Sequence, residues 1–263
     1  MTLLAWIILF SLLGGVLSVL AASMFLALPE AFRVRAMPHF VSFAVGALLG
    51  AAFLGLLPHA LAGPGVKDFH TITLAVLLGL LGFFVLEKMV LWRHCHADHC
   101  EAHTPGHDHG DAHDGRAAGT LILIGDGIHN FVDGVLIAAA FLTDLHLGIV
   151  TSLAVAAHEI PQEVGDFAVL LHSGFSRAKA FLYNMLASMT TVIGALLGYF
   201  SLASVESVLP YVLAVAAASF IYIAVADLIP GLHKRLQPAA TVQQATLITA
   251  GVVVIYAVHS TLH

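Results

Sequence analysis

The fold of this chain is decided first by the stretch LLAWIILFSLLGGVLSVLAASMFLAL, residues 3–28, which contains no charged side chain. A helix needs about 20 apolar residues to cross roughly 30 Å of hydrocarbon, so this run is long enough to span a bilayer. No basic residue precedes it, which argues against a cleavable signal peptide. The stretch therefore predicts a membrane protein.

The rest of the chain repeats this composition. Of the 263 residues, 59% are hydrophobic and 10% are charged, whereas a soluble domain carries about a quarter charged residues. Seven further apolar runs follow, at approximately 39–62, 71–92, 118–142, 147–172, 180–202, 208–231 and 243–262. Lipid offers the backbone no hydrogen-bond partner, and strand-like alternation is absent. We therefore expect eight transmembrane helices in one all-α transporter domain, residues 1–263.

The basic residues indicate the orientation of these helices. Nine of the ten Lys and Arg residues fall in odd-numbered connections, and only Lys67 lies in an even-numbered one. Basic loops stay in the cytoplasm by the positive-inside rule, so both termini are expected to be extracytoplasmic. This predicts an integral protein of the plasma (cytoplasmic) membrane with the lipid bilayer as its partner. We expect no nucleic-acid partner, and a homodimer remains open.

The segment 93–117, RHCHADHCEAHTPGHDHGDAHDGRA, is the only long polar connection. It is too polar and Gly-rich to pack a core, and it predicts a disordered cytoplasmic loop between the third and fourth helices. Its candidate ligands for divalent metals are His94, Cys95, His96, His99, Cys100, His103, His107, His109 and His113. Their spacing matches no structural zinc module. A loose metal-collecting or sensing loop and a merely solubilising loop both remain open.

Two adjacent runs carry polar stripes. The stripe of the run 118–142 contains Asp126, His129, Asn130 and Asp133, and that of the run 147–172 contains His158, Glu159, Gln162, Glu163 and Asp166. At about 100° per residue, each set falls within one arc of a helix, roughly 100° and roughly 140° wide. The runs are joined by only about five residues, TDLHL at 143–147, so they are expected to be antiparallel neighbours with both stripes near the bilayer midplane.

Charged groups at that depth need compensation. One charged residue costs at least about 2.5–3.5 kcal/mol at the centre of a membrane helix. A divalent cation would compensate the carboxylates and use the imidazoles as neutral ligands. The stripes offer imidazole nitrogen, carboxylate oxygen and amide oxygen without thiolates or thioethers, which fits a first-row divalent metal and disfavours Cu(I). A seam of interhelical hydrogen bonds is the alternative.

Two further polar residues lie near span ends. His59 follows Pro58 and Asp227 precedes Pro230, and both are candidate pathway residues. The phrases GLLPHAL (55–61) and DLIPGLH (227–233) end the second and seventh runs at opposite faces of the bilayer. That placement is typical of an inverted repeat, as in many transporters.

The stripes resemble two motifs of the ZIP (Zrt-, Irt-like protein) family of divalent-metal transporters. HNFVDG at 129–134 resembles its fourth-helix His-Asn-x-x-Asp-Gly motif, and HEIPQEVGD at 158–166 its fifth-helix His-Glu-x-Pro-His-Glu-x-Gly-Asp motif. Gln162 stands where many relatives have His. Some relatives also carry a helix-six carboxylate, which LASMTTVIG (186–194) lacks, and GAAFLGLLPH (50–59) lacks an acid and a His of the entry path.

The resemblance implies a two-metal centre. One metal would contact His129, Asp133, His158 and Gln162, and the other Asn130, Asp133, Glu159 and Gln162, with Asp126, Glu163 and Asp166 as supporting or pathway residues. The implied function is uptake of Zn²⁺, or of Fe²⁺, Mn²⁺ or Cd²⁺, into the cytoplasm, with the metal as cargo and no cofactor or enzymatic activity.

Two rival functions use the same residues. An intramembrane zinc protease needs His-Glu-x-x-His on one helix, and HEIPQ has Gln162 in place of the second His. A metal sensor that does not transport would have the same ligands as a carrier, so only flux distinguishes the two.

Overall fold

The computed structural model describes residues 1–95, 112–235 and 237–262, and in these ranges the chain is helical without any strand. The all-α prediction is confirmed for this part of the chain. The helices are α1 (Leu3–Gly14), α2 (Val16–Leu26), α3 (Glu30–Gly50), α4 (Leu57–Ala62), α5 (Phe69–Cys95), α6 (Ala112–Thr143), α7 (Leu145–His172), α8 (Arg177–Leu202), α9 (Leu209–Tyr222), α10 (Ile229–Leu232) and α11 (Pro238–Leu262). Two π-helical segments, η1 (Ala51–Leu56) and η3 (Ile223–Leu228), and a short 3₁₀ turn, η2 (Glu206–Val208), complete the described elements.

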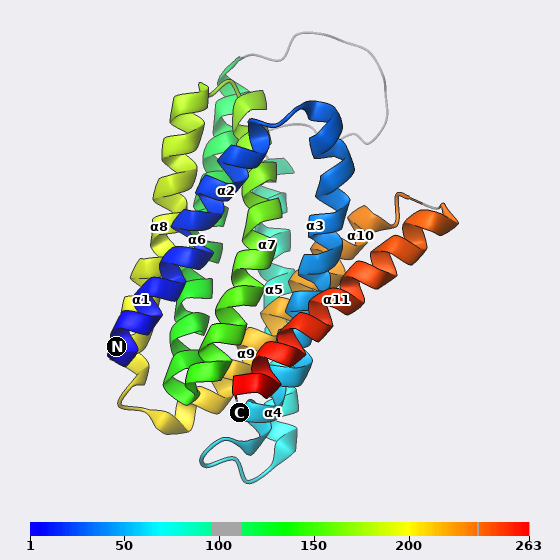
Figure 1. The fold of residues 1–263 in the computed structure, drawn as a ribbon. Helices are drawn as coiled ribbons and strands as arrows, with labels where there is room; N and C mark the ends of the chain where they lie inside the picture. The colour runs from blue at the N-terminus through cyan, green and yellow to red at the C-terminus, as the bar shows by residue number, and fades with distance from the viewer. Residues whose placement is uncertain (96–111, 236, 263) are drawn as a thin grey trace.

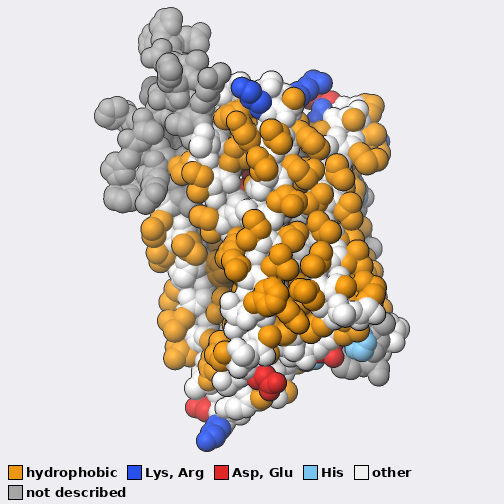
Figure 2. All heavy atoms as spheres, turned by 90° about the vertical axis from the view of Figure 1, so that its left-hand side faces the viewer, with side chains coloured by type: hydrophobic (Ala, Val, Ile, Leu, Met, Phe, Trp, Pro, Cys, Tyr) orange, Lys and Arg blue, Asp and Glu red, His pale blue; other side chains and the backbone are white. Residues whose placement is uncertain are grey.

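Among the described residues, seven helical stretches are long and apolar enough to cross a membrane. They are Leu3–Leu26, Glu30–Ala62, Phe69–Met89, Gly119–Thr143, Arg177–Leu202, Glu206–Leu232 and Pro238–Thr261. Helix α7, with 28 residues, is not among them because its polar stripe lowers its hydropathy. Figure 2 shows hydrophobic side chains covering one face of the bundle between ends that carry Lys and Arg side chains. This surface is typical of a protein surrounded by lipid.

Helices border the loop predicted at about 93–117 and extend a few residues into that range on both sides. Helix α5 continues to Cys95 and α6 begins at Ala112. A helix satisfies its own backbone hydrogen bonds, so it can continue from lipid into water where the apolar run has ended. His94 and Cys95 thus lie in the last turn of α5, and His113 lies in the first turn of α6. The other predicted loop ligands, His96, His99, Cys100, His103, His107 and His109, lie outside the described residues.

The first apolar run is not one continuous helix. It is interrupted at Gly15, where α1 ends and α2 begins. A Cβ at Gly15 would overlap the Ser188 carbonyl and lie 3.1 Å from the Thr191 hydroxyl. The break therefore lets the N-terminal span approach α8 closely, a tertiary contact that hydropathy does not encode.

The two Leu/Ile-Pro phrases share one structural feature. In each phrase the residue before the proline donates its N–H to the carbonyl five residues earlier. Leu57 donates to Ala52, and Ile229 donates to Ala224. Proline has no N–H to give, and this wider register redistributes the backbone hydrogen bonds around it. The repetition of a six-residue π-helix in the second and seventh spans supports the predicted internal repeat.

The helices form two groups (Figure 1). The site group contains α1, α2, α6, α7 and α8, and the flanking group contains α3, α4, α5, α9, α10 and α11. The groups meet where α7 packs on α3 and α11 and where α6 packs on α9. Both marked termini lie toward the lower end of the bundle in Figure 1, which also carries the α4–α5 connection.

Helices within each group approach closely through paired glycines. A Cβ at Gly134 of α6 would overlap the Thr191 carbonyl, and one at Gly194 of α8 would overlap the Phe131 carbonyl. Gly46 of α3 and Gly251 of α11 form an equivalent crossing in the flanking group. Small residues permit such backbone approach between membrane helices.

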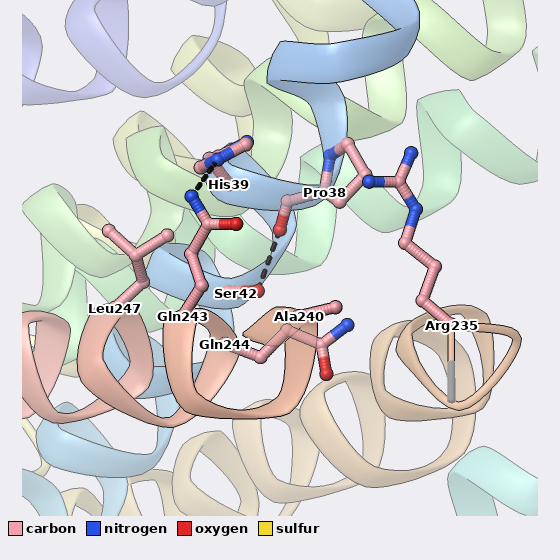
Figure 3. Close-up of a pocket in the computed structure, with 8 residues that line it drawn as sticks. All are labelled: Pro38, His39, Ser42, Arg235, Ala240, Gln243, Gln244 and Leu247. Carbon is pink, nitrogen blue, oxygen red and sulfur yellow. Dashed lines mark hydrogen bonds between the residues drawn. The ribbon is translucent and has the colours of Figure 1, made fainter. Parts of the chain in front are cut away.

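The contact between α3 and α11 ends in polar interactions (Figure 3). His39 is hydrogen-bonded to Gln243, and the Arg235 guanidinium donates to the Val34 carbonyl at 3.1 Å. The cavity between these side chains measures about 10 Å³, which is about the space of one water molecule. These residues therefore hold helices together and leave no room for a ligand.

Candidate metal centre

Helices α6 and α7 are joined by a tight turn that fixes their relative position. Asp144 begins α7, and its Oδ1 accepts the N–H groups of His146 and Leu147, each at 2.9 Å. Partial burial raises the pKa of the Asp144 carboxyl, but these N–H donors and His146 outweigh it and hold that pKa below its usual value. The turn reverses the chain, so the two polar stripes lie against each other in antiparallel helices.

Four side chains of these stripes converge on one point. The Nε2 atoms of His129 and His158 lie 3.3 Å apart. Glu159 Oε1 lies 3.3 Å from the first nitrogen and 3.6 Å from the second, and Asp133 Oδ2 lies 3.7 Å and 3.3 Å from them. Asp133, His158 and Glu159 are at most 1% exposed. All four ligand atoms lie within 4.8 Å of one another.

These separations suit a tetrahedral divalent cation. Ligands about 2.0–2.1 Å from a tetrahedral zinc lie roughly 3.3–3.4 Å from each other. Five of the six separations in the cluster lie between 3.3 and 3.7 Å. Two imidazoles and two carboxylates are ligand types that zinc and similar first-row metals accept. We call this cluster of His129, Asp133, His158 and Glu159 the tetrahedral site.

His158 is held in an orientation suited to coordination. Its Nδ1 lies 3.1 Å from the Ala154 carbonyl, so the ring donates there and leaves the Nε2 lone pair toward the cluster. Metal-binding histidines commonly donate their other nitrogen to a backbone carbonyl in this way. The ring of Phe220, which is fully buried in α9, lies against it with a centroid distance of 6.2 Å. The flanking group thereby covers one side of the site.

The two predicted amide ligands, Asn130 and Gln162, lie beside the cluster and contact other groups. The side-chain oxygen of Asn130 accepts a hydrogen bond from the Thr191 hydroxyl at 2.7 Å, and its side-chain NH₂ donates to Asp126 Oδ1 at 2.9 Å. The Gln162 NH₂ donates to the same carboxylate oxygen at 3.4 Å. In this arrangement Glu159 is the fourth member of the tetrahedral site, and both amides orient Asp126.

A second group of carboxylates adjoins the first. Asp126, Glu159 and Glu163 each place an oxygen within 4.8 Å of the others, and all three are buried. Ser188 of α8 donates a hydrogen bond to Glu163 Oε1, and the Asn184 NH₂ donates to the Glu163 carbonyl at 3.4 Å.

Sequence reasoning assigned no role to the small polar residues of α8. Asn184, Ser188 and Thr191 are spaced i, i+4 and i+7 and are all buried. Such spacing places them on one helix face, which is the signal that could have indicated their contact with the stripes.

A cavity of about 640 Å³ leads away from the site. Asp126, His129, His158 and Gln162 line it together with Asp166 and Asp227. Gly165 also faces this space, where a Cβ would meet nothing within 4 Å. His59 lies elsewhere, against a separate cavity of about 260 Å³. The structure thus places Asp166 and Asp227 in the same space as the tetrahedral site and His59 outside it.

Comparison with known proteins gives the family. The profile of the family described as "ZIP Zinc transporter" matches residues 93–259. The chain is 35% identical over 230 residues to "Zinc transporter ZIP13" of Pongo abelii, covering 81% of this chain and 64% of that protein. It is 32% identical over 256 residues to "Zinc transporter ZIP4" of Homo sapiens, covering 76% and 39%. Against "Zinc transporter ZIP10" of Homo sapiens it is 41% identical over 150 residues, covering 55% and 18%.

The helical bundle and its buried histidine–carboxylate cluster define an integral membrane protein of the metal-transporting class. The chain belongs to the ZIP zinc transporter family. It spans between about a fifth and two thirds of the length of the three relatives named above. The family relation supports divalent-metal transport, and a transporter rather than an enzyme.

Proposed function

We propose that this protein takes up Zn²⁺ into the cytoplasm across the plasma membrane, with the cation held at the tetrahedral site. The observation that carries the proposal is that four ligand atoms from two facing helices lie at the separations of a zinc tetrahedron. The relatives named zinc transporters support zinc as the cargo. The mixed N/O ligands would also accept Fe²⁺, Mn²⁺ or Cd²⁺.

The direction of transport is supported by charge and by the cavity. The cavity is lined by the N-terminal part of α6, the C-terminal part of α7, the N-terminal part of α3 and η3. These parts lead to the connections that carry nine of the ten basic residues, which we assign to the cytoplasm. The opposite half is filled by buried apolar side chains, among them Ile137, Phe141, Leu147 and Leu213. This arrangement fits a state open to the cytoplasm and closed to the outside, with both termini outside.

The mechanism we propose is alternating access. The cation sheds water at the tetrahedral site, and movement of the site group against the flanking group exposes that site to one side and then to the other. Asp166 and Asp227 would receive the cation on the cytoplasmic side because they line the same cavity. His59 lies at the outer end of the second span, so it would contact the cation before the cation reaches the tetrahedral site. Protons compete for these ligands, so uptake should depend on pH.

The test is zinc flux into proteoliposomes. We expect His158→Ala and Asp133→Ala each to lower zinc uptake by at least about tenfold, because each removes one of four ligands. His172→Ala is the matched control, since His172 lies on the same helix and is exposed. Zinc flux in both site variants equal to that of the control would refute the proposed site.

The two rival functions, a metal sensor and a membrane protease, predict different results for the same proteoliposomes. A sensor would bind zinc without giving flux. A membrane protease needs a second histidine at position 162, but this residue is Gln162, and its amide contacts Asp126 instead of the tetrahedral site.

A further inference from the structure

An apolar groove of about 540 Å³ lies between α6 and α8. Its walls come from one face of each helix and include Leu123, Gly127 and Phe131 of α6 and Tyr183, Ala187 and Thr190 of α8. Ile124, Ile128 and Leu186 also line it and are each more than half exposed, so the groove is open to the outside of the bundle. It lies within the spans Gly119–Thr143 and Arg177–Leu202. The groove therefore opens where hydrocarbon surrounds the protein.

The groove arises from the way in which the two helices cross. They approach most closely at Gly134 and Gly194, where a Cβ would overlap a carbonyl of the other helix. Two turns closer to the N-terminus of α6 the contact is looser, because a Cβ at Gly127 would meet only Thr190 Cγ2, at 3.9 Å. Gly127 has no side chain to fill this space, so a hollow remains beside the crossing.

The main polar group of the groove wall is satisfied within the protein. The Thr190 hydroxyl is hydrogen-bonded to the carbonyls of Gly127 and Ala187, at 2.7 Å and 2.6 Å. Water enters a cavity only where polar groups can hydrogen-bond it, and the other walls are mostly apolar side chains. The occupant of such a groove inside a bilayer is therefore itself apolar.

We infer that the groove binds one acyl chain of an anionic phospholipid whose headgroup contacts Lys179. Helix α8 lies on the side of the bundle that faces the viewer in Figure 2, and this face is largely hydrophobic with Lys and Arg side chains at its upper end. The site is separate from the tetrahedral site and does not depend on the proposed transport of zinc.

The size of the groove fits an acyl chain better than a helix. A methylene group is about as large as a water molecule, whose share of the liquid is about 30 Å³, so 540 Å³ holds on the order of 18 methylenes, about one acyl chain. The wall from Thr120 to Phe131 is about 16 Å long at 1.5 Å per residue. A helix of that length and about 10 Å wide occupies on the order of 1,300 Å³. A helix from a second copy of the chain would enter the groove only in part.

The headgroup decides which lipid binds. Lipid tails are as apolar as the groove, so contacts with the chain alone do not distinguish one phospholipid from another. Lys179 is exposed and lies four residues before Tyr183, on the same face of α8 and one turn beyond the groove. A basic residue at the membrane surface favours an anionic lipid about fivefold. Arg177 lies two residues earlier, about 200° around the helix, and points away from the groove.

The experiment counts the phospholipids that the whole chain retains in native mass spectrometry. Wild type, Gly127→Leu, Leu123→Trp and Lys179→Gln are reconstituted in an equal mixture of phosphatidylglycerol and phosphatidylcholine with the same tails and are then transferred to detergent. Gly82→Leu in α5, where a Cβ meets nothing within 4 Å, is the control for a larger side chain. Arg177→Gln is the control for the lost charge. The Tm of each protein is measured with and without added phosphatidylglycerol.

We expect wild type and both controls to retain one tightly held phosphatidylglycerol, and both groove variants, Gly127→Leu and Leu123→Trp, to lose it. Lys179→Gln should retain the two lipids in a ratio lowered about fivefold toward phosphatidylcholine. Added phosphatidylglycerol should raise the Tm of wild type more than that of the groove variants, because a ligand stabilises only the protein that binds it.

Four results would overturn the inference. One is an equal phosphatidylglycerol count in wild type and both groove variants, and another is equal retention of the two lipids by wild type. The third is an unchanged lipid ratio in Lys179→Gln, which would remove the headgroup contact. The fourth is a dimer of wild type that both groove variants lose, which would assign the groove to a second copy of the chain.

Discussion

The crossing of α6 and α8 allows a sharp test, because the site depends on it. A Cβ at Gly134 would overlap the Thr191 carbonyl oxygen and lie 2.7 Å from the Ala195 nitrogen and 2.8 Å from the Thr191 carbonyl carbon. Ordinary contacts begin at 3.4 Å. Backbone atoms cannot rotate away, so Gly134→Ala requires α8 to move outward, on the order of 1 Å, as expected for an overpacked core.

The free-energy change follows from three contributions. Overpacking of this kind costs about 1–3 kcal/mol. The shift also stretches the buried Thr191–Asn130 and Ser188–Glu163 hydrogen bonds, worth about 1 kcal/mol each. Replacing Gly by Ala in a helix stabilises the folded state by up to about 1 kcal/mol, because Ala has the higher helix propensity. The net destabilisation is about 2–4 kcal/mol, which corresponds to a fall in Tm on the order of 5–15 °C for a chain of this size.

The assay is thermal unfolding of the detergent-purified protein, with zinc binding measured on the same sample. The matched control is Gly82→Ala in α5, where a Cβ meets nothing within 4 Å. This control should be as stable as wild type or more stable, by up to about 1 kcal/mol. A Gly134→Ala protein whose Tm equals that of the control would show that α8 is not held against α6 as described.

Three further outcomes can be checked. Asp144→Ala removes the N-cap of α7 and should cost about 1 kcal/mol. Because folding lowers the pKa of Asp144, this stabilisation is present above the unfolded pKa of about 3.9 and is lost as the pH falls through the lower folded pKa. The Tm values of wild type and variant should therefore converge in acid, and a growing difference there would contradict the assignment. Thr191→Val removes the donor to Asn130, so it should weaken zinc binding by about 10–100-fold and lower the Tm by the loss of about 1 kcal/mol from this buried hydrogen bond. Unchanged zinc affinity would show that this contact does not support the site. Cys95 and Cys100 are the only cysteines and lie in the predicted cytoplasmic loop, so an impermeant maleimide should label them only after the cells are permeabilised. Labelling in sealed cells would show that the topology is the opposite of the predicted one.

The membrane helices and the two polar stripes could be predicted because they depend on local patterns. Apolar length sets a span, and a period of 3.6 residues places Asp126, His129 and Asp133 on one face of α6. The short connection 143–147 made α6 and α7 neighbours. These features do not depend on the other helices, so sequence alone was sufficient.

Which side chain points into the cluster could not be predicted in the same way. Glu159 and Gln162 are three residues apart, about 60° around the helix, so a modest rotation of α7 exchanges them. That rotation is set by the packing of α7 against α3, α6 and α8. The break at Gly15 and the role of Ser188 have the same origin, since both arise from where α8 docks.

The two π-helical segments connect the repeat to the proposed movement. On the side that faces the rest of the bundle η1 is tightly packed: Ala51, Ala52 and Leu56 are fully buried, and a Cβ at Gly55 would lie 3.2 Å from Leu147 of α7. The corresponding segment η3 borders the open cavity through Ile223, Asp227 and Leu228. The two parts that the predicted repeat would make equivalent are thus packed in η1 and open to the cavity in η3. In an inverted repeat, the opposite state of the transporter is obtained by exchanging these two environments. The π-helices would serve this exchange, since a proline-bordered segment with a wider hydrogen-bond register can change its packing on α7 without unfolding.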